Sequence, residues 1–340
     1  MAYIEIDSSN YFHNLNQIAK KTGSVDKIFA VLKDNAYGHG LLEIASLAKK
    51  FGIKRVVVKN LKEALAIENM FEEILILSEI PKKEIPKNIS VTINDINDLK
   101  ILSPKTNIHL KIDTGMHRNG IEAKYLKKAL SLIKEKRLNL LAVMTHFRSA
   151  DELSSELFWQ KKVWDEIKTQ AKNFCKSLHL QTPLFHSNNS AALFRLKTFD
   201  EDFARCGIAT YGYLEMDSIF GNFNLKPVLK LWANKISSRD LKKGERVGYG
   251  GVFEAKEDMK ISTYDIGYGD GFFRSDGKKE LKTADGKKIL GRISMDNFVC
   301  EGDEEKVLLI DNAKQTAKVF NTISYEITTK LSPFIKRIVI

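Results

Sequence analysis

Cysteine and long hydrophobic runs are scarce in this sequence. Its 340 residues include only three cysteines, Cys175, Cys206 and Cys300, which lie far apart and form no CxxC pair. Such spacing encodes neither a disulfide framework nor a zinc site, and it favours a reducing, cytoplasmic location. No stretch of about 18 uncharged apolar residues occurs, and the first residues lack a basic segment followed by an apolar run, so we expect neither a membrane span nor secretion.

A block of basic residues is also absent, although the chain is positively charged. Lys and Arg number 54 against 43 Asp and Glu, which gives a formal net charge of +11. The lysines occur in pairs spread through amphipathic stretches, with acidic residues between them and no interleaved aromatic platform. We therefore interpret the charge as a solvated surface and predict no nucleic-acid binding, which needs a clustered patch.

What the chain does contain is an alternating pattern of strands and helices. Hydrophobic residues make up 43% of it, enough for a sizeable core over about two domains. Helical periodicity is clear at 41–51, 122–136 and 155–178. The β-branched runs predict eight strands, at 28–33, 55–59, 74–78, 90–93, 107–113, 139–147, 183–187 and 204–211. Eight successive βα units predict a TIM barrel.

The pattern changes after about Phe223. Segments such as ERVGYGGVF and KKILGRISMDNFVC are short alternating strands broken by Gly, Asp and Asn turns. We therefore predict an α/β chain, with a (β/α)8 TIM barrel over residues 1–223 and a mostly-β domain over 224–340. Because no linker rich in Pro, Gly or Ser separates the two domains, we expect them to pack directly against each other.

In a TIM barrel, reactive groups lie where the strands end and the βα loops begin. Lys33 ends the first predicted strand and precedes DNAYGHG, whose glycines let the backbone approach a ligand. A lysine partly desolvated there can form a Schiff base with an aldehyde cofactor, although a lysine at a strand end is also commonly a surface residue. On the fifth strand, alternation turns His109, Lys111 and Asp113 toward the barrel interior. A structural ion network between Asp113 and Lys111 is the alternative to a site there.

Later loops carry further polar residues. His146 follows the sixth strand, where a histidine is often only a satisfied core residue. Ser190 opens a helical run and Gly207 follows Arg205 on the eighth strand, in the loops where TIM barrels commonly bind phosphate. A plain helix cap at Ser190 and a packing role for Gly207 are the alternatives.

Taken together, these motifs resemble those of the alanine racemases, in order and over nearly the whole chain. They are AVLKDNAYGHG, HLKIDTGMHRNG, MTHF, HSNNSAA, RCGIATYG, VGYGGVF, IGYGDG, GRISMDN and TISYEI. The resemblance implies pyridoxal 5'-phosphate as cofactor and a head-to-tail homodimer with shared active sites. It also implies a cytoplasmic isomerase that interconverts L-alanine and D-alanine with two bases and supplies D-alanine for cell-wall peptidoglycan.

The resemblance also implies roles for individual residues. Lys33 matches the lysine that binds the cofactor and serves as one base, and Tyr249 matches the opposite base, supplied by the other subunit. Arg118 matches the arginine that meets the substrate carboxylate, and Lys111 a lysine often found as a carbamate. The remaining matches are the phosphate-binding positions Tyr37, Ser190, Gly207, Ile208 and Tyr325, then His146 beside the cofactor ring, Arg205 facing the pyridine nitrogen, and Tyr268 and Met295 lining the substrate entrance from the partner.

Some positions depart from the pattern of that family. Asp34 stands where Ala commonly follows the lysine, Cys206 where Pro is usual, and Arg148 where Ala often follows THF. Near the end, FIKR replaces an RVPR-like run. None of these is a catalytic position, but Asp34 and Arg148 change the charge near the site.

Three rival functions can be weighed against a racemase of alanine. A decarboxylase of the same architecture would lack the Tyr249-Gly250 pair, and a cofactor-carrying protein without turnover would need only the barrel. A racemase of broader range, acting on Ser, Lys or Arg, is often exported and disulfide-bearing, and this sequence has neither feature. Preference between Ala and Ser stays open.

Overall fold

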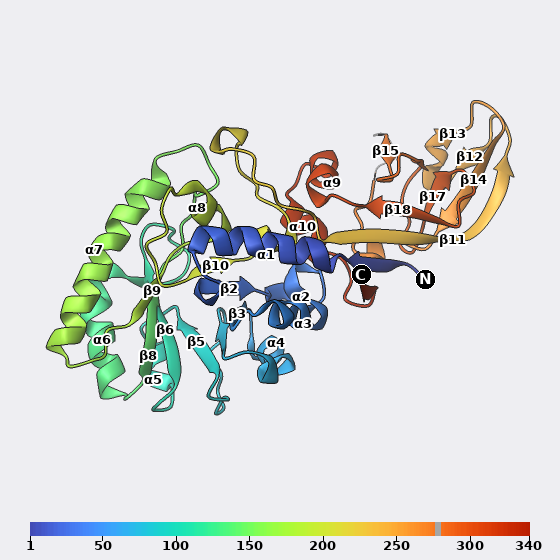
Figure 1. Ribbon diagram of the computed structural model, residues 1–340. Helices are drawn as coiled ribbons and strands as arrows, with labels where there is room; N and C mark the ends of the chain where they lie inside the picture. Colours follow the sequence, from blue (N-terminus) through green and yellow to red (C-terminus); the bar gives the residue numbers. More distant parts are fainter. Residues whose placement is uncertain (276–279) are drawn as a thin grey trace.

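The first part of the chain forms the expected barrel. The structure, a computed structural model, describes residues 1–275 and 280–340. Within these residues, eight parallel strands follow one another around the barrel in the order β10-β2-β3-β4-β5-β6-β8-β9, and a short β7 (Ile121–Glu122) is added to β6 (Figure 1). The barrel strands are β2 (Ile28–Val31), β3 (Arg55–Val58), β4 (Glu73–Ile76), β5 (Ile89–Ile93), β6 (Asn107–Asp113), β8 (Asn139–Met144), β9 (Leu184–His186) and β10 (Ala204–Cys206).

The barrel is nearly closed rather than fully closed. No strand ladder joins β9 to β10 in the described part of the chain. Two backbone hydrogen bonds bridge the seam instead, from Asp202 N–H to the Phe185 carbonyl (3.1 Å) and from Arg205 N–H to the Asn188 carbonyl (2.9 Å). The seam therefore lies between two of the segments predicted to hold the cofactor.

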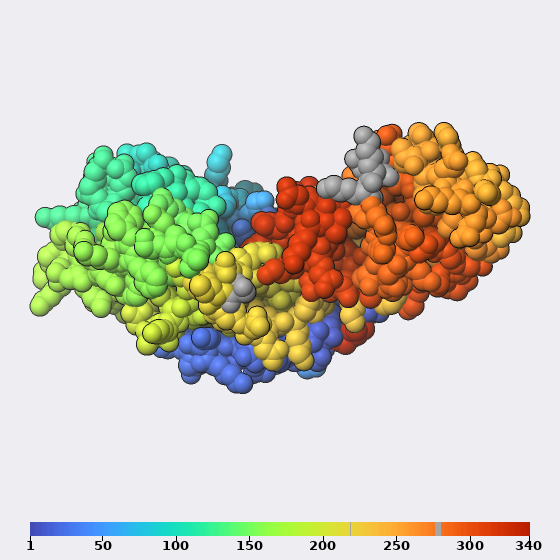
Figure 2. Space-filling model, turned by 90° about the horizontal axis from the view of Figure 1, so that it is seen from above, coloured from blue at the N-terminus to red at the C-terminus, as the bar shows by residue number. Residues whose placement is uncertain are grey.

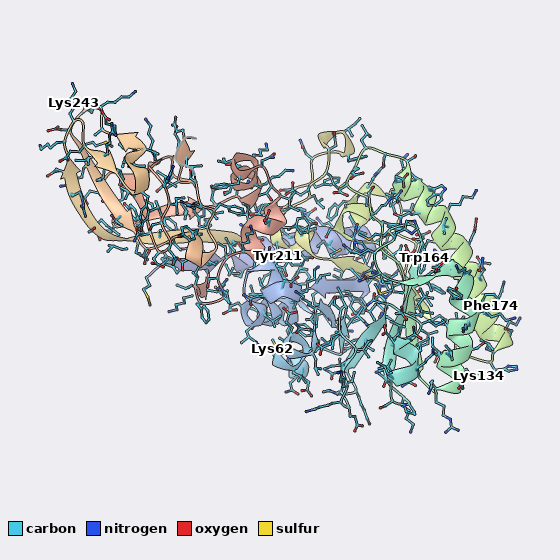
Figure 3. The ribbon with its side chains drawn as sticks, turned by 180° about the vertical axis from the view of Figure 1, so that it is seen from behind. Lys62, Lys134, Trp164, Phe174, Tyr211 and Lys243 are labelled. Carbon is cyan, nitrogen blue, oxygen red and sulfur yellow. The ribbon has the colours of Figure 1, made fainter. Side chains whose placement is uncertain are left out.

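Helices surround the strands. They are α1 (Ser8–Thr22), α2 (Lys33–Tyr37), α3 (Leu41–Phe51), α4 (Leu61–Ala66), α5 (Asp98–Ile101), α6 (Leu126–Glu135), α7 (Glu156–Ser177) and α8 (Ser190–Arg195). On α7, Trp164 is fully buried, points inward toward the strands (Figure 3), and donates its indole N–H to Glu201 at 2.7 Å. The helices predicted at 41–51 and 155–178 are confirmed to within one residue, whereas the one predicted from 122 begins at Leu126.

Six of the predicted strands are too long at their carboxyl ends, and in three of them the excess includes candidate site residues. The first ends at Val31, the sixth at Met144 and the eighth at Cys206. Residues Ile208–Tyr211 instead form a 3-10 turn, because the Gly207 carbonyl accepts hydrogen bonds from both the N–H and the hydroxyl of Thr210. In these three, the shortening places Lys33, His146, Gly207 and Ile208 after the ends of the strands.

The second part is a mixed, strand-rich domain. Its main sheet runs β15-β16-β17-β14-β11-β1-β19, with β18 also on β11, and β12 pairs with β13. It contains two helices, α9 (Ala313–Phe320) and α10 (Ser324–Thr329), that the sequence analysis missed. The strands are β11 (Leu229–Leu241), β12 (Arg246–Val247), β13 (Phe253–Glu254), β14 (Met259–Tyr264), β15 (Leu281–Lys282), β16 (Lys288–Leu290), β17 (Phe298–Glu301), β18 (Lys306–Ile310) and β19 (Lys336–Val339).

Both ends of the chain meet in this second sheet. Strand β1 (Tyr3–Ile6) pairs antiparallel with β11 and parallel with β19. Strand β1 therefore belongs to the second sheet and not to the barrel, although it falls within residues 1–223. The boundary drawn between residues 223 and 224 stays a prediction.

The two parts pack directly against each other. The C-terminal helices, red in Figure 2, lie between the barrel and the strands of the second domain. Tyr211 sits where the two parts meet (Figure 3), donates its hydroxyl to the Val31 carbonyl at 2.9 Å and stacks on His39. None of the helices in the described residues is long and apolar enough to cross a membrane.

Candidate active site

A cavity of about 520 Å³ opens at the carboxyl ends of the barrel strands. Its lining includes ten of the thirteen residues that the motifs single out. These are Lys33, Tyr37, Lys111, Arg118, His146, Ser190, Arg205, Gly207, Ile208 and Tyr325. Parallel strands bring their carboxyl ends to one side of a barrel, which is why residues spread from 33 to 208 converge there.

Lys33 is followed by an unusual turn. The four residues Asp34 to Tyr37 all have positive φ, between 51° and 55°, which costs a non-glycine residue on the order of 1–3 kcal/mol each. The turn is held from outside, because Asn35 N–H donates to the Glu63 carboxylate at 3.0 Å. It brings the Tyr37 ring to 5.9 Å from the Lys33 ammonium, and the Asp34 carboxylate lies 3.9 Å from that ammonium.

The second domain clamps the same turn from the other side. Gly38 lies so close to α10 that a Cβ there would be 1.9 Å from the Thr328 carbonyl oxygen. Arg337 of β19 donates to the Gly38 carbonyl at 2.9 Å, and the Tyr325 ring lies 5.8 Å from that of Tyr37. The end of the chain therefore fixes one wall of the cavity, including the arginine of the divergent FIKR run.

Two backbone N–H groups converge on Ser190, next to Tyr37. Ser190 Oγ accepts from Gly207 N–H at 3.2 Å and from Ala209 N–H at 3.3 Å. The cap of α8 is Asn189, whose side chain accepts from Ala192 N–H, so the helix-cap alternative for Ser190 is wrong. Two N–H donors aimed at one oxygen make a concavity that suits an anion.

Gly207 also has a steric role. A Cβ at this position would lie 2.4 Å from the Tyr37 hydroxyl, inside any normal contact distance. The glycine thus lets the Tyr37 side chain reach the loop that carries the converging N–H groups. Burial first, and then the neighbouring Tyr325, raise the pKa of Tyr37, so its hydroxyl keeps its proton and can donate.

Arg205 is buried, and most of its N–H groups donate hydrogen bonds within the protein. Its Nη1 donates to His186 Nδ1 (2.6 Å) and the His186 carbonyl (2.9 Å), and its Nη2 to the Thr145 (2.6 Å) and Ser187 (3.1 Å) carbonyls. A guanidinium has five N–H donors. The remaining one, Nε–H, has no protein partner among the described residues, and Arg205 lines the cavity. Burial lowers the pKa of Arg205 to about 10, so it stays a cation at neutral pH.

Positive charge is concentrated around the cavity. Burial, reinforced by Arg205 and Arg118, lowers the pKa of Lys111 to about 8. Burial, with Arg205, Lys111, Arg118 and Lys33 in that order, holds the pKa of His146 well below its usual range, so this imidazole is neutral. A cavity with this potential favours ligands that carry phosphate or carboxylate groups.

The alternative considered for the fifth strand, an ion network between Asp113 and Lys111, does not form in the described part of the chain. Asp113 accepts backbone N–H bonds from Gly115, Met116 and His117 and so shapes the loop that carries Arg118. No ion pair between Asp113 and Lys111 occurs in the described residues. Lys111 instead lines the cavity.

Three predicted residues lie away from the cavity, on the second domain. Tyr249, Tyr268 and Met295 have exposed fractions of 69%, 40% and 55%. Tyr249 lies in the segment between β12 and β13, at the end of the second domain remote from the barrel (Figure 1). Tyr268 and Met295 lie together, since Gly269 N–H donates to the Met295 carbonyl at 2.8 Å. Within one chain, the structure does not bring these three to Lys33.

Comparison with known proteins places this geometry in a family. The family model for the N-terminal domain of alanine racemase matches residues 6–215, and that for its C-terminal domain matches residues 228–339. The chain belongs to the alanine racemase family. Since this is a family of isomerases, the chain is an enzyme.

Full-length relatives agree with the family assignment. The chain is 51% identical to an alanine racemase of a Nitratiruptor species and 47% identical to one of Campylobacter curvus, each over 99% of both chains. A solved alanine racemase of Bacillus anthracis with bound L-Ala-P has a TM-score of 0.88 and 30% identity over 100% of this chain and 95% of that one. For an alanine racemase of Clostridium difficile 630, the TM-score is 0.87 and the identity 25%, over the same shares of the two chains.

The alanine racemase motifs did not reveal what lies beneath Arg205. His186 and His109 occur within two of those motifs, and Glu73 lies outside them all, yet the three side chains form a hydrogen-bonded chain that ends on Arg205. The alternation of side chains along the fifth strand predicted that His109 faces the barrel interior, but it indicated no role for this residue. The sequence signal that was available is a polar residue on the inner face of a barrel strand, which is costly unless paired.

Proposed function

We propose that this protein binds pyridoxal 5'-phosphate in the barrel cavity and uses it to interconvert L-alanine and D-alanine. The observation that carries the proposal is the convergence of ten motif residues on one cavity. Membership of the alanine racemase family supports the reaction.

The lining fits that cofactor in its charge and its hydrogen-bonding groups. The backbone at Gly207 and Ile208, the Ser190 hydroxyl and the two tyrosines Tyr37 and Tyr325 would hold the phosphate. The Arg205 Nε–H would donate to the pyridine nitrogen, His146 would lie beside the ring, and Lys33 would bind the aldehyde carbon. When bound, the cofactor supplies an electron sink for the substrate carbon that loses its proton.

Arg205 would influence which reaction follows. An arginine does not give up its proton at neutral pH, so a ring nitrogen that accepts from it stays unprotonated. Such a ring is a weaker electron sink than one paired with a carboxylic acid, and this favours return of the proton to the substrate carbon over transfer to the cofactor.

Racemisation needs a proton removed from one face of the substrate carbon and another delivered to the opposite face. Lys33 is the base that the cavity itself provides. The second base, Tyr249, is solvent-exposed in its own chain. We infer a head-to-tail homodimer in which the partner inserts Tyr249, with Tyr268 and Met295 at the entrance, since a symmetric pair lets each subunit complete the other.

Two cationic residues would handle the substrate carboxylate. Arg118 lines the cavity and is the group that would meet it. Lys111, whose pKa is lowered to about 8, has more of the neutral amine that reacts with CO2 than an ordinary lysine, so it is a good candidate for a carbamate. Such an anion would hold the Arg118 guanidinium in place instead of repelling it.

The direct test is an assay of D-alanine formation from L-alanine by the purified protein, with and without added pyridoxal 5'-phosphate. We expect cofactor-dependent formation of D-alanine, without release of CO2. Release of CO2 would indicate the related decarboxylase instead. Faster turnover of serine, lysine or arginine than of alanine would indicate a racemase of broader range.

The shared site has a separate test. Lys33→Ala and Tyr249→Phe protomers should each be inactive or nearly so, and mixing them should restore activity because a hybrid dimer contains one intact site. Subunit exchange is confirmed beforehand by native mass spectrometry. An unrescued mixture would place both bases within one chain.

In the cell, we propose that the enzyme acts in the cytoplasm and supplies D-alanine for cell-wall peptidoglycan. The expected consequence is that a strain without this activity needs D-alanine for growth. Growth of the deletion strain without D-alanine would contradict this role, unless a second enzyme forms D-alanine.

A further inference from the structure

A buried chain of hydrogen bonds runs from Arg205 toward the amino-terminal end of the barrel. His186 Nδ1 accepts from Arg205 at 2.6 Å, His186 Nε2 lies 2.8 Å from His109 Nδ1, and His109 Nε2 lies 2.7 Å from the Glu73 carboxylate. The two imidazoles have exposed fractions of 0% and 1%. Phe29 packs on both rings, stacked on His186 and edge-on to His109, so the two buried imidazoles share an apolar neighbour.

The proton arrangement along this chain is fixed by its two ends. Arg205 is only a donor, so His186 Nδ1 has no proton and, in a neutral ring, His186 Nε2 carries it. His109 Nδ1 must then accept, which leaves the His109 proton on Nε2, directed at the Glu73 carboxylate. Burial, then the positive charge of Arg205, holds the pKa of His186 well below its usual range, in agreement with a neutral ring.

Glu73 is itself held in place at the far end. The Ser90 hydroxyl donates to it at 2.8 Å, and Arg55 Nε lies 3.6 Å from its other oxygen. Burial tends to raise the pKa of Glu73, but His109, Ser90 and Arg55 outweigh it, so the net pKa is lowered and the group is ionised at neutral pH. The buried guanidinium of Arg205 has no ion pair in the described residues, and Glu73 is the carboxylate that its hydrogen-bond chain reaches.

We propose that Glu73 is a positioning residue for the active site, acting through His109 and His186 to set the orientation of Arg205. Resting on the proposed cofactor, the inference is that the carboxylate, by accepting from His109 Nε2, stabilises both histidines in the tautomers that a donating Arg205 requires. His186 then accepts from the Arg205 Nη1, and the guanidinium keeps Nε–H for the ligand in the cavity. Consecutive hydrogen bonds in a buried network polarise and strengthen one another. The Glu73 carboxylate, three hydrogen bonds from Arg205, can therefore affect it.

The tautomers can be read directly by ¹⁵N NMR of protein labelled only at histidine, with the cofactor bound and after its removal. We expect His186 and His109 each to show a protonated Nε2 and an unprotonated Nδ1. A proton on Nδ1 of either ring would overturn the proposal. Because the cofactor-free protein gives this readout, its outcome does not depend on whether the proposed function is right.

The variant Glu73→Gln removes the charge with little change in shape, and Glu72→Gln is a matched control because Glu72 is the exposed neighbouring carboxylate. For Glu73→Gln we expect shifted His109 and His186 signals and a kcat lower by roughly tenfold with KM little changed, by analogy with the low end of the loss when the hydrogen-bond partner of a metal-binding histidine is removed. We also expect more cofactor converted to its amine form per turnover. Glu73→Asp should restore part of the signal pattern.

Two outcomes would overturn the proposal. One is a Glu73→Gln protein whose histidine signals and kcat equal those of Glu72→Gln. The other is a loss of thermal stability in Glu73→Gln with unchanged histidine signals, which would make Glu73 a packing residue. If Glu73→Gln does not fold, the ¹⁵N NMR measurement of the histidine tautomers in the unmodified protein tests the proposal.

Discussion

The two halves of the proposed site differ in how they are built. In the barrel, Arg205, Lys111 and Ser190 are buried, and Arg205 and Ser190 are held by hydrogen bonds within the protein. On the second domain, Tyr249 and Met295 are solvent-exposed. The difference fits the proposed homodimer, in which one chain would preassemble the cofactor half of the site and a second copy would bury the other half.

The backbone follows the same division. In the barrel, four non-glycine residues from Asp34 onward adopt positive φ because contacts from both domains hold them there. Around Tyr249 the backbone reaches positive φ with glycines instead, at Gly248 (67°), Gly250 (74°) and Gly251 (51°). Glycines adopt such angles without external support. The following predictions test this comparison.

The largest effect is expected on the preassembled half. Lys33→Ala removes the amine that would bind the cofactor and serve as a base, so D-alanine formation should fall on the order of 10⁴-fold. Lys59→Ala is the control, because Lys59 also pairs with Asp34 but lies outside the cavity. The rate is measured by coupled assay, and a Lys33→Ala enzyme with normal activity would show that another group does this work.

Tyr249→Phe tests the exposed half. Exchange of the Cα hydrogen of L-alanine with deuterated solvent should fall on the order of 100-fold or more, the scale of losing a general base, while exchange from D-alanine through Lys33 persists. The variant should still bind the cofactor. Both exchanges are followed by NMR, with Tyr125→Phe, an exposed tyrosine of the barrel, as control. Equal losses from the two enantiomers would rule out the two-base assignment.

Lys111→Met tests the cost of burying this lysine beside other cations. Since the pKa of Lys111 is lowered to about 8 from 10.5, the unfolded chain binds more protons than the folded one between these values, and stability rises with pH there. At pH 7 the variant should therefore gain at most about 3 kcal/mol over the unmodified protein, and the gain should fade as pH rises from 8 to 10.5.

The measurement for Lys111 is urea unfolding of cofactor-free protein in CO2-free buffer. Adding bicarbonate at pH 7 should shrink the difference if a carbamate forms. If the difference in unfolding free energy between the two proteins does not change with pH, the charged form of Lys111 is not destabilised in the folded protein.

The smallest effect is expected from Gly207→Ala. Its Cβ would lie 2.4 Å from the buried Tyr37 hydroxyl, so the phosphate-binding loop must shift, and cofactor affinity should fall roughly tenfold. Affinity is measured by titrating cofactor-free protein and following absorbance. Adding Tyr37→Phe should recover part of the loss by removing the clashing oxygen, and additive losses would show that the two residues are not coupled.

Much of the barrel could be predicted from local patterns, because β-branched runs and loop motifs recur at the spacing of βα units. The strand ends could not be predicted in the same way. Lys33, Thr145 and Gly207 follow apolar runs in the sequence without a break, yet they lie outside the hydrogen-bonded strands. Helix α10 was missed because its segment, SYEITT, is rich in residues that favour strands, and it folds as a helix where packing against the barrel requires one.

By itself, the sequence determined the barrel, the strand-rich second domain and the motif residues that reach the cavity, because short-range patterns and the rule for carboxyl ends of parallel strands suffice for these. Only the tertiary structure decided that β1 joins the second sheet, that Arg337 supports the turn after Lys33, and that Glu73 is linked to Arg205. The physical reason is that each of these contacts joins residues far apart in the chain. Such pairs leave no periodic signal in the sequence and form only when the elements that carry them pack together.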